Sequence, residues 1–188
     1  VTLAAEIAKK SEAKVILLNV IEGTRIFSFN TMGEVTGPTG EEEFYVKKLI
    51  DVQRERLERA SKNDVLNGID VETVLELGSP YEGISNVIAD RAADLLVMGT
   101  KGASGLDEVL IGSNTEKVVR YAKCPVITVK EEVSLEKIKH IVFATNLTDD
   151  QSRLVEAINK ISEMTGADIH LLKVNTPNHF FTQRQLEE

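Results

Sequence analysis

The residues best suited to hold a ligand lie in a glycine-rich stretch over residues 95–113. The stretch opens with four apolar residues, 95–98, a run typical of a strand that is buried on both faces. Four glycines and a serine follow: Gly99, Gly102, Gly105, Gly112 and Ser113. A strand, a glycine-rich loop and a helix N-terminus, in this order, can hold a phosphate group. Glycine lets the backbone approach the anion, and the N–H groups of the first helical turn point at it.

This stretch differs from the two most familiar phosphate-binding loops. A P-loop contains Gly-Lys-Ser/Thr, and a dinucleotide-binding loop contains Gly-x-Gly-x-x-Gly, and the sequence has neither. What remains is Gly99-x2-Gly102-x9-Gly112-Ser113, with Met98 immediately before it. The spacing therefore indicates a phosphate loop of another kind.

Alternating helices and apolar strands surround the loop and must position it. Periodicity predicts helices over 1–10, 41–62, 79–93 and 113–121, and strands over 14–20, 71–77, 94–98 and 125–129. Residues 22–40, rich in Gly, Thr and Asn, predict a long loop. Ser79 and Ser113 each precede a glutamate by three residues, which predicts a capping box at the start of each helix. Such alternation is typical of a parallel sheet with helices on both faces.

The same pattern begins again near residue 138. We expect strands over 138–145 and 167–174, with a helix over 149–165 between them. A shift of 154 positions aligns identical residues: Ala167, Leu171, Leu172, Val174 and Phe181 fall on Ala13, Leu17, Leu18, Val20 and Phe27. We interpret this as an internal repeat whose first copy has lost its opening strand. The chain would then be a window cut from a tandem protein, truncated at both ends.

Composition and charge limit the kinds of molecule that the protein can bind and the compartment that it occupies. A net charge of −8 over 188 residues argues against nucleic acid and anionic membranes as partners. No run approaches the roughly 18 apolar residues of a membrane span, and no signal pattern opens the chain. The single cysteine, Cys124, excludes an internal disulfide and fits a reducing compartment. We therefore expect a cytoplasmic protein.

Other reactive side chains give weaker signals. Cys124 is interpreted as a small, half-buried residue before a strand, since no basic partner is evident. His140, His170 and His179 are far apart in the sequence, and two lie in strand-like runs, so no metal site is expected. No spacing indicates a Ser-His-Asp set or a catalytic carboxylate pair, and no catalytic residue is predicted.

The spacing Gly-x2-Gly-x9-Gly-Ser, between a strand and a helix, resembles the nucleotide-binding pattern of the universal stress protein (UspA-like) family. The resemblance implies an α/β fold with an open, twisted parallel sheet and helices on both faces. That sheet is Rossmann-like (adenine nucleotide alpha hydrolase-like) with strand order 3-2-1-4-5. Residues 1–130 would form one domain lacking its first strand, 131–137 a linker, and 138–188 the start of a second domain.

The resemblance also implies a site for ATP or AMP, with Mg²⁺ as a further candidate. Four residues would surround the phosphates: Gly99, Gly102, Gly112 and Ser113. Asn114 would also bind the nucleotide. Val20 and Met98 would border the base and ribose. Asn146 stands where the family has an acidic residue that meets the nucleoside.

Three functions remain open at this stage. The first is binding of adenine nucleotide in a stress response, without turnover, because no general base or metal-binding carboxylate is evident. The second is a nucleotide-free, dimerising interaction module of the same fold. The third is a slow ATPase, which needs a water-activating residue that the sequence does not show.

Two expectations concern assembly. Residues 125–129 form an apolar edge strand with few charges, which predicts a homodimer or a higher assembly through that edge. In the family's strand order the missing first strand lies at the centre of the sheet. Residues 138–145, its copy in the second repeat, are expected to fill that place, either within one chain or by exchange with a second copy.

Overall fold

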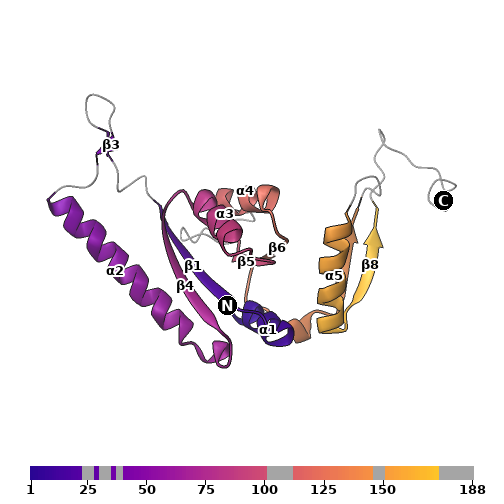
Figure 1. Cartoon of the computed structure of the whole chain (residues 1–188). Helices are drawn as coiled ribbons and strands as arrows, with labels where there is room; N and C mark the ends of the chain where they lie inside the picture. Colours follow the sequence, from indigo (N-terminus) through magenta and orange to yellow (C-terminus); the bar gives the residue numbers. More distant parts are fainter. Residues whose placement is uncertain (23–27, 30–34, 37–39, 101–111, 146–150, 174–188) are drawn as a thin grey trace, which may run out of the picture. The chain divides into compact units, whose positions relative to one another are not determined.

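The computed structural model describes residues 1–22, 28–29, 35–36, 40–100, 112–145 and 151–173. The chain divides into two compact units, Val1–Val133 and Ser134–Glu188. The first contains α1 (Thr2–Ser11), β1 (Val15–Glu22), β2 (Ser28–Phe29), β3 (Val35–Thr36), α2 (Glu41–Ser61), the 3-10 helix η2 (Asp64–Leu66), β4 (Val71–Gly78), α3 (Pro80–Asp90), β5 (Leu96–Gly99), α4 (Ser113–Tyr121) and β6 (Val126–Val129) (Figure 1). The second contains the 3-10 helix η3 (Leu135–Lys137), β7 (His140–Ala144), α5 (Ser152–Thr165) and β8 (Asp168–Leu172).

Parallel strand pairs form the framework of both units. β1 pairs with β4 from Val15↔Val71 to Glu22↔Gly78, and β5 pairs with β6 from Leu96↔Val126 to Gly99↔Val129. In the second unit β7 pairs with β8, also in parallel. Helices separate the two strands of each of these pairs, so the predicted α/β, Rossmann-like class is confirmed. In the family's numbering, which counts the missing first strand, the β4–β1 pair corresponds to strands 3-2 and the β5–β6 pair to strands 4-5. The complete order 3-2-1-4-5 stays a prediction.

The inner edge of β1 is the place predicted for the missing strand. The N–H of Val15 donates to the carbonyl of Asp70 at 2.9 Å. Peptide groups alternate in direction along a strand, so those of Ile16 and Leu18 face the opposite edge. No described strand of this chain pairs there.

The prediction that 138–145 enters that place within one chain is wrong. Ile141 pairs with Ile169 and Phe143 pairs with Leu171, so β7 belongs to β8. A single 14-residue helix connects β7 to β8, so pairing these two strands closes a shorter loop than pairing β7 with β1 would. Exchange of this strand between two copies stays a prediction.

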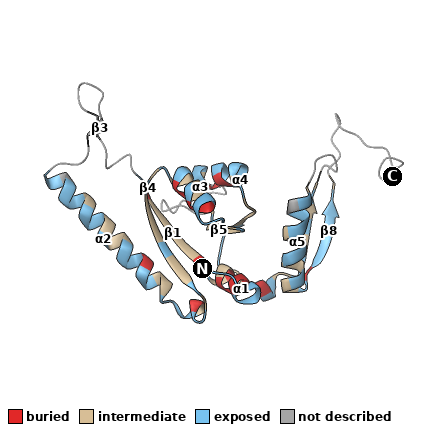
Figure 2. Cartoon of the chain, viewed as in Figure 1, coloured by how far each residue is buried: buried red, intermediate tan, exposed pale blue. Residues whose placement is uncertain are grey.

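The core of the first unit lies under α1. Ala5, Ala8, Val15 and Leu66 form a buried cluster, with α1 contacting both β1 and η2 (Figure 2). The apolar positions of α1 recur at helical spacing, so one face of the helix is buried while Lys9 and Lys10 stay exposed. The amino ends of β1 and β4 are thereby fixed.

Helix α3 contacts the β1–β4 pair and also α4. It begins after Ser79 with Pro80 at its first position, as predicted. The rings of Tyr81 and Tyr121 meet edge to face, with centroids 6.2 Å apart, across the α3–α4 contact. α3 is thus the element that links the first strand pair to the helix following the glycine loop.

Helix α2 buries less than its sequence predicts. Among its apolar residues, Leu57 is 8% exposed, whereas Leu49 is 40% exposed. Charged residues flank the apolar positions, so only a narrow stripe meets β1 and β4 (Figure 2). Within the predicted loop 22–40, β2 and β3 form a short antiparallel pair. None of the described helices combines the length and apolarity needed to cross a membrane.

Candidate functional site

The structure brings the two ends of the glycine-rich loop together. Thr115, in the first turn of α4, donates its Oγ1 hydrogen to the carbonyl oxygen of Gly99 at 3.3 Å. Thr100 extends the β5–β6 ladder by one bond, from its N–H to the carbonyl of Val129 at 3.1 Å. A Cβ atom on Gly112 would lie 3.7 Å from the carbonyl oxygen of Thr100. The end of β5 and the start of α4 therefore form one compact site.

The start of α4 differs by one residue from the sequence prediction. Gly112 is the N-cap and Ser113 is the first helical residue, so the predicted Ser113 cap is wrong. The carbonyl of Gly112 accepts the N–H of Glu116 at 2.9 Å, which closes the first helical turn. No side chain caps α4 or α3, so neither predicted capping box forms.

The absence of a side-chain cap at α4 has a chemical consequence. The N–H groups of a first helical turn lack partners within their own helix and need one from outside. The hydroxyl of Thr115 donates its hydrogen bond to Gly99, and Ser113 and Asn114 are exposed. The peptide N–H groups of the first turn of α4, at the positive end of the helix dipole, therefore suit an anion.

Among the described residues, nothing crowds the glycines at the two ends of the loop. The nearest described atom to a Cβ on Gly99 would be the carbonyl oxygen of Val129 at 4.0 Å, and a Cβ on Gly112 would make only ordinary contacts. Gly112 has a φ of −57°, which any residue adopts. Among the described residues, neither packing nor backbone conformation requires glycine at these two positions.

Gly83 of α3 shows the opposite situation. A Cβ there would lie 3.0 Å from both γ carbons of Val20 and 3.3 Å from Cβ of Glu76. Glycine at this position lets α3 approach the strand pair closely. Val20, predicted to border the base and ribose, therefore packs its side chain against α3.

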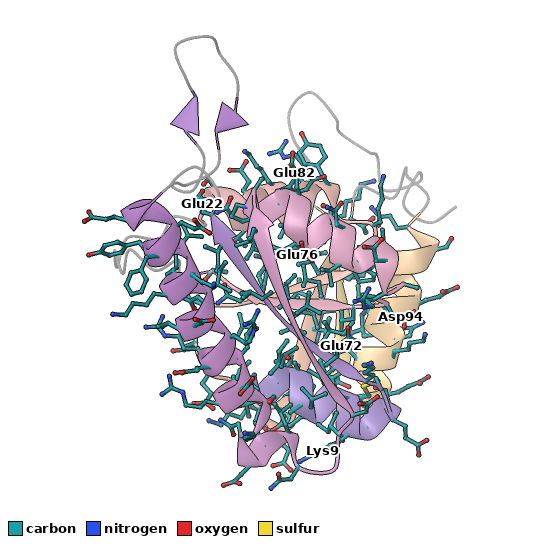
Figure 3. The ribbon with its side chains drawn as sticks, turned by 60° about the vertical axis from the view of Figure 1, so that its left-hand side comes forward. Lys9, Glu22, Glu72, Glu76, Glu82 and Asp94 are labelled. Carbon is teal, nitrogen blue, oxygen red and sulfur yellow. The ribbon has the colours of Figure 1, made fainter. Side chains whose placement is uncertain are left out.

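Acidic side chains surround the carboxyl ends of β1 and β4. Glu22 ends β1, Glu76 lies near the end of β4, and Glu82 is in the first turn of α3 (Figure 3). Carboxylates repel a phosphate, whereas the N–H groups of α4 attract it. Within this unit the electrostatics therefore favour the α4 end for an anion.

The remaining predicted residues fall in two groups. Met98 lies on β5, half-buried, directly before Gly99. Gly102 and Asn146 lie outside the described residues. Sequence reasoning missed Thr100 and Thr115, although a threonine in the first turn of a helix after a glycine loop is a recognisable signal for such a bond.

A cluster of charged side chains joins the amino ends of the same strands. Glu72 accepts hydrogen bonds from Lys14 Nζ at 2.8 Å and from Arg91 Nε at 2.9 Å. These two cations lower the pKa of Glu72, and the bond to Glu72 raises the pKa of Lys14. The cluster ties β1, β4 and the end of α3 together.

Two other reactive groups are placed by the structure. Cys124 is half-buried before β6, as expected, and this burial raises the pKa of its thiol. The expectation that the histidines are separate is wrong for one pair. His140 and His170 approach within 3.1 Å across β7 and β8, because adjacent parallel strands bring together residues that are distant in sequence.

Comparison with known proteins gives one consistent result. The sequence pattern of the Universal stress protein family matches residues 1–130. The universal stress protein MJ0577 of Methanocaldococcus jannaschii is 31% identical over 128 residues, which cover 64% of this chain and 79% of that protein. A putative universal stress protein of Staphylococcus aureus is 31% identical over 130 residues, which cover 69% of this chain and 74% of that protein.

Solved structures agree in fold. The structure of MJ0577 superposes with a TM-score of 0.52 at 30% identity, covering 70% of this chain and 88% of that one. A universal stress protein from Archaeoglobus fulgidus superposes with a TM-score of 0.66 at 20% identity, covering 93% of this chain and 63% of that one. The second likeness shows a shared fold.

Proposed function

Because the chain belongs to the universal stress protein family, we propose that its first unit binds ATP or AMP at the junction of β5 and α4. The phosphates lie against the backbone of Gly99 and Gly112 and the first turn of α4. Gly102, Ser113 and Asn114 complete the phosphate contacts. Met98 and Val20 border the nucleoside.

The observation that carries this proposal is that no described atom crowds the Cβ positions of Gly99 and Gly112. Glycines are commonly required by a positive φ or by close packing, and neither explanation applies among the described residues here. Close approach of a ligand to the backbone is a third requirement, and it fits a loop that ends at an uncapped helix N-terminus. The site thus offers N–H donors and keeps side chains away from them.

The proposed activity is binding without turnover. The described groups around the junction are peptide N–H groups, the hydroxyls of Thr100, Ser113 and Thr115, the amide of Asn114 and the carboxylate of Glu116. The hydroxyl and amide groups are not general bases near neutral pH, and the Glu116 carboxylate accepts a hydrogen bond from Arg120 at 3.0 Å. Such a site holds and orients a nucleotide, and Mg²⁺ would accompany the phosphates as an oxygen-bound ion.

Two further features belong to the same proposal. The protein acts as a cytoplasmic dimer, with the outer edge of β6 meeting a second copy. Support comes from the lone, half-buried cysteine, which fits a reducing compartment, and from the outer edge of β6, which pairs with no described strand. The dimer alone, without nucleotide, is the alternative function.

Calorimetry with ATP and AMP tests the proposal. Gly112→Val should abolish binding, and Gly112→Ala should weaken it at least about tenfold, equivalent to about 1.4 kcal/mol. Both variants should fold, because the nearest described atom to a Cβ at Gly112 lies 3.7 Å away. Lys117→Val, on the exposed side of the same helix, is the control and should bind as the original chain does. Equal affinities for all four proteins, or no heat with either nucleotide, would favour the scaffold function.

A further inference from the structure

The two histidines of the second unit form a pair that no part of the proposed nucleotide site uses. His140 is the first residue of β7, and His170 is the third of β8. The Nδ1 atom of His140 lies 3.1 Å from the Nε2 atom of His170, and the ring centroids are 5.2 Å apart at an interplanar angle of 49°. The rings therefore meet through their nitrogens and not by stacking.

The strand register places an acidic side chain on the same face. His140 pairs with Asp168, and Val142 pairs with His170. Side chains two residues apart on a strand share a face, and partners in register do so as well. His140, Asp168 and His170 accordingly project from one face of the β7–β8 pair, and all three are exposed.

The spacing of the two nitrogens suits a metal ion. A tetrahedral Zn²⁺ with each nitrogen about 2.0–2.1 Å away holds two such ligands about 3.3–3.4 Å apart. The observed 3.1 Å differs from this by a few tenths of an ångström, which small rotations of two exposed rings supply. A single proton shared between the nitrogens is the other arrangement that this distance allows.

The backbone holds the pair in place without the metal. The N–H of Asp168 donates to the carbonyl of Lys139, and the N–H of Thr145 donates to the carbonyl of Leu172, each at 3.0 Å. These bonds flank the histidine pair at both ends of the ladder. Because the strands are already paired, metal binding has to order only two side chains.

We propose that His140 Nδ1 and His170 Nε2 bind a divalent transition-metal ion of the Zn²⁺ type, with the Asp168 carboxylate beside it. The part of the chain that the structure describes contains no group of three metal-ligating side chains already in place. The site is consequently open, with water completing the coordination. Imidazole nitrogens select such ions over Mg²⁺, which requires oxygen ligands.

The histidine pair lies at the opposite end of its strand pair from the position that the family uses for nucleotide. His140 and Asp168 are the first residues of their strands, at the amino end of the β7–β8 pair. The family's nucleotide position, Asn146, follows the carboxyl end of β7. A metal bound by the histidines is therefore not the Mg²⁺ that accompanies a nucleotide.

Zinc titration of the whole chain against a chromophoric chelator tests the proposal. The original chain should take up one Zn²⁺, and His140→Gln and His170→Gln should each lower its affinity at least about tenfold. Asp168→Asn should lower the affinity less. His179→Gln is the matched control and should leave the affinity unchanged, and Mg²⁺ should not compete.

Imidazole ¹⁵N spectra provide a second measurement that does not depend on variants. Added Zn²⁺ should shift the Nδ1 resonance of His140 and the Nε2 resonance of His170. The proposal is overturned if the original chain takes no Zn²⁺ from the chelator, or if the two histidine variants bind as tightly as it does. Shifts confined to His179 would overturn it equally.

Discussion

Replacing Gly83 by alanine tests how closely α3 packs on the strands that support the nucleotide site. The new methyl group would meet both γ carbons of Val20 at 3.0 Å, about half an ångström inside the optimal carbon–carbon separation of about 3.5–4.0 Å. Val20 cannot retreat easily, because β1 is paired with β4 along its length. Either α3 must shift outward or the valine must leave its preferred rotamer.

The expected magnitude follows from two opposing effects. Overpacking of a core typically costs about 1–3 kcal/mol, whereas alanine in place of glycine within a helix contributes about 1 kcal/mol in the other direction. We expect a net loss of about 1 kcal/mol in the free energy of unfolding, and a melting temperature lower by roughly 2–4 °C. Steric conflict predicts that the effect is specific to Val20.

Urea unfolding followed by circular dichroism measures this effect in a double-mutant cycle. Gly83→Ala, Val20→Ala and the double variant are compared with the original chain. The double variant should be more stable than the sum of the two single effects predicts, by at least about 0.5 kcal/mol. If Gly83→Ala is as stable as the original chain, or if the two effects simply add, the close packing of α3 on Val20 is refuted.

Three further predictions follow from the described contacts. Glu72→Gln should lower the melting temperature at pH 7. Ion pairing lowers the folded-state pKa of Glu72, so the ionised carboxylate stabilises the fold above the ordinary glutamate pKa. This stabilisation is lost as pH falls through the lowered value, so the melting temperatures of Glu72→Gln and of the original chain should converge in acid. Cys124 should react with an alkylating reagent more slowly in the folded than in the unfolded chain at neutral pH, because burial raises its pKa; equal rates would contradict this. Since the N–H of Leu96 donates to the carbonyl of Pro125 and that of Thr100 to Val129, the peptide N–H of Thr128 faces the outer edge of β6. Thr128→Pro should therefore turn a dimer into a monomer in light scattering, and a monomeric original chain would rule out the proposed dimer.

Local patterns in the sequence predicted the order of elements around the site. Residues 96–98 form most of β5 because a continuous apolar run suits a strand between helices. The family resemblance supplied the outer strand pairings. The order of the elements depends on neighbouring residues, so a single sequence contains that information, whereas the pairings needed the resemblance.

Contacts between distant residues could not be predicted in the same way. Ser113 carries the usual signal of an N-cap, yet Gly112 occupies that position because Thr115 bonds to Gly99 and fixes where the helix begins. His140 and His170 are 30 residues apart and meet only because β7 and β8 pair in parallel. The need for glycine at Gly83 appears only when α3 is packed on Val20.

Amide chemical-shift mapping with ATP tests the central claim most directly. If the phosphates lie at the junction of β5 and α4, the N–H resonances of Gly99, Gly112, Ser113 and Asn114 should shift as ATP is added, and AMP should shift a subset of them. The amides of Gly40, Gly68 and Gly166 are internal controls and should not move. Unchanged amide resonances at Gly112 and Ser113, with ATP at a concentration that shifts other residues, would contradict the account.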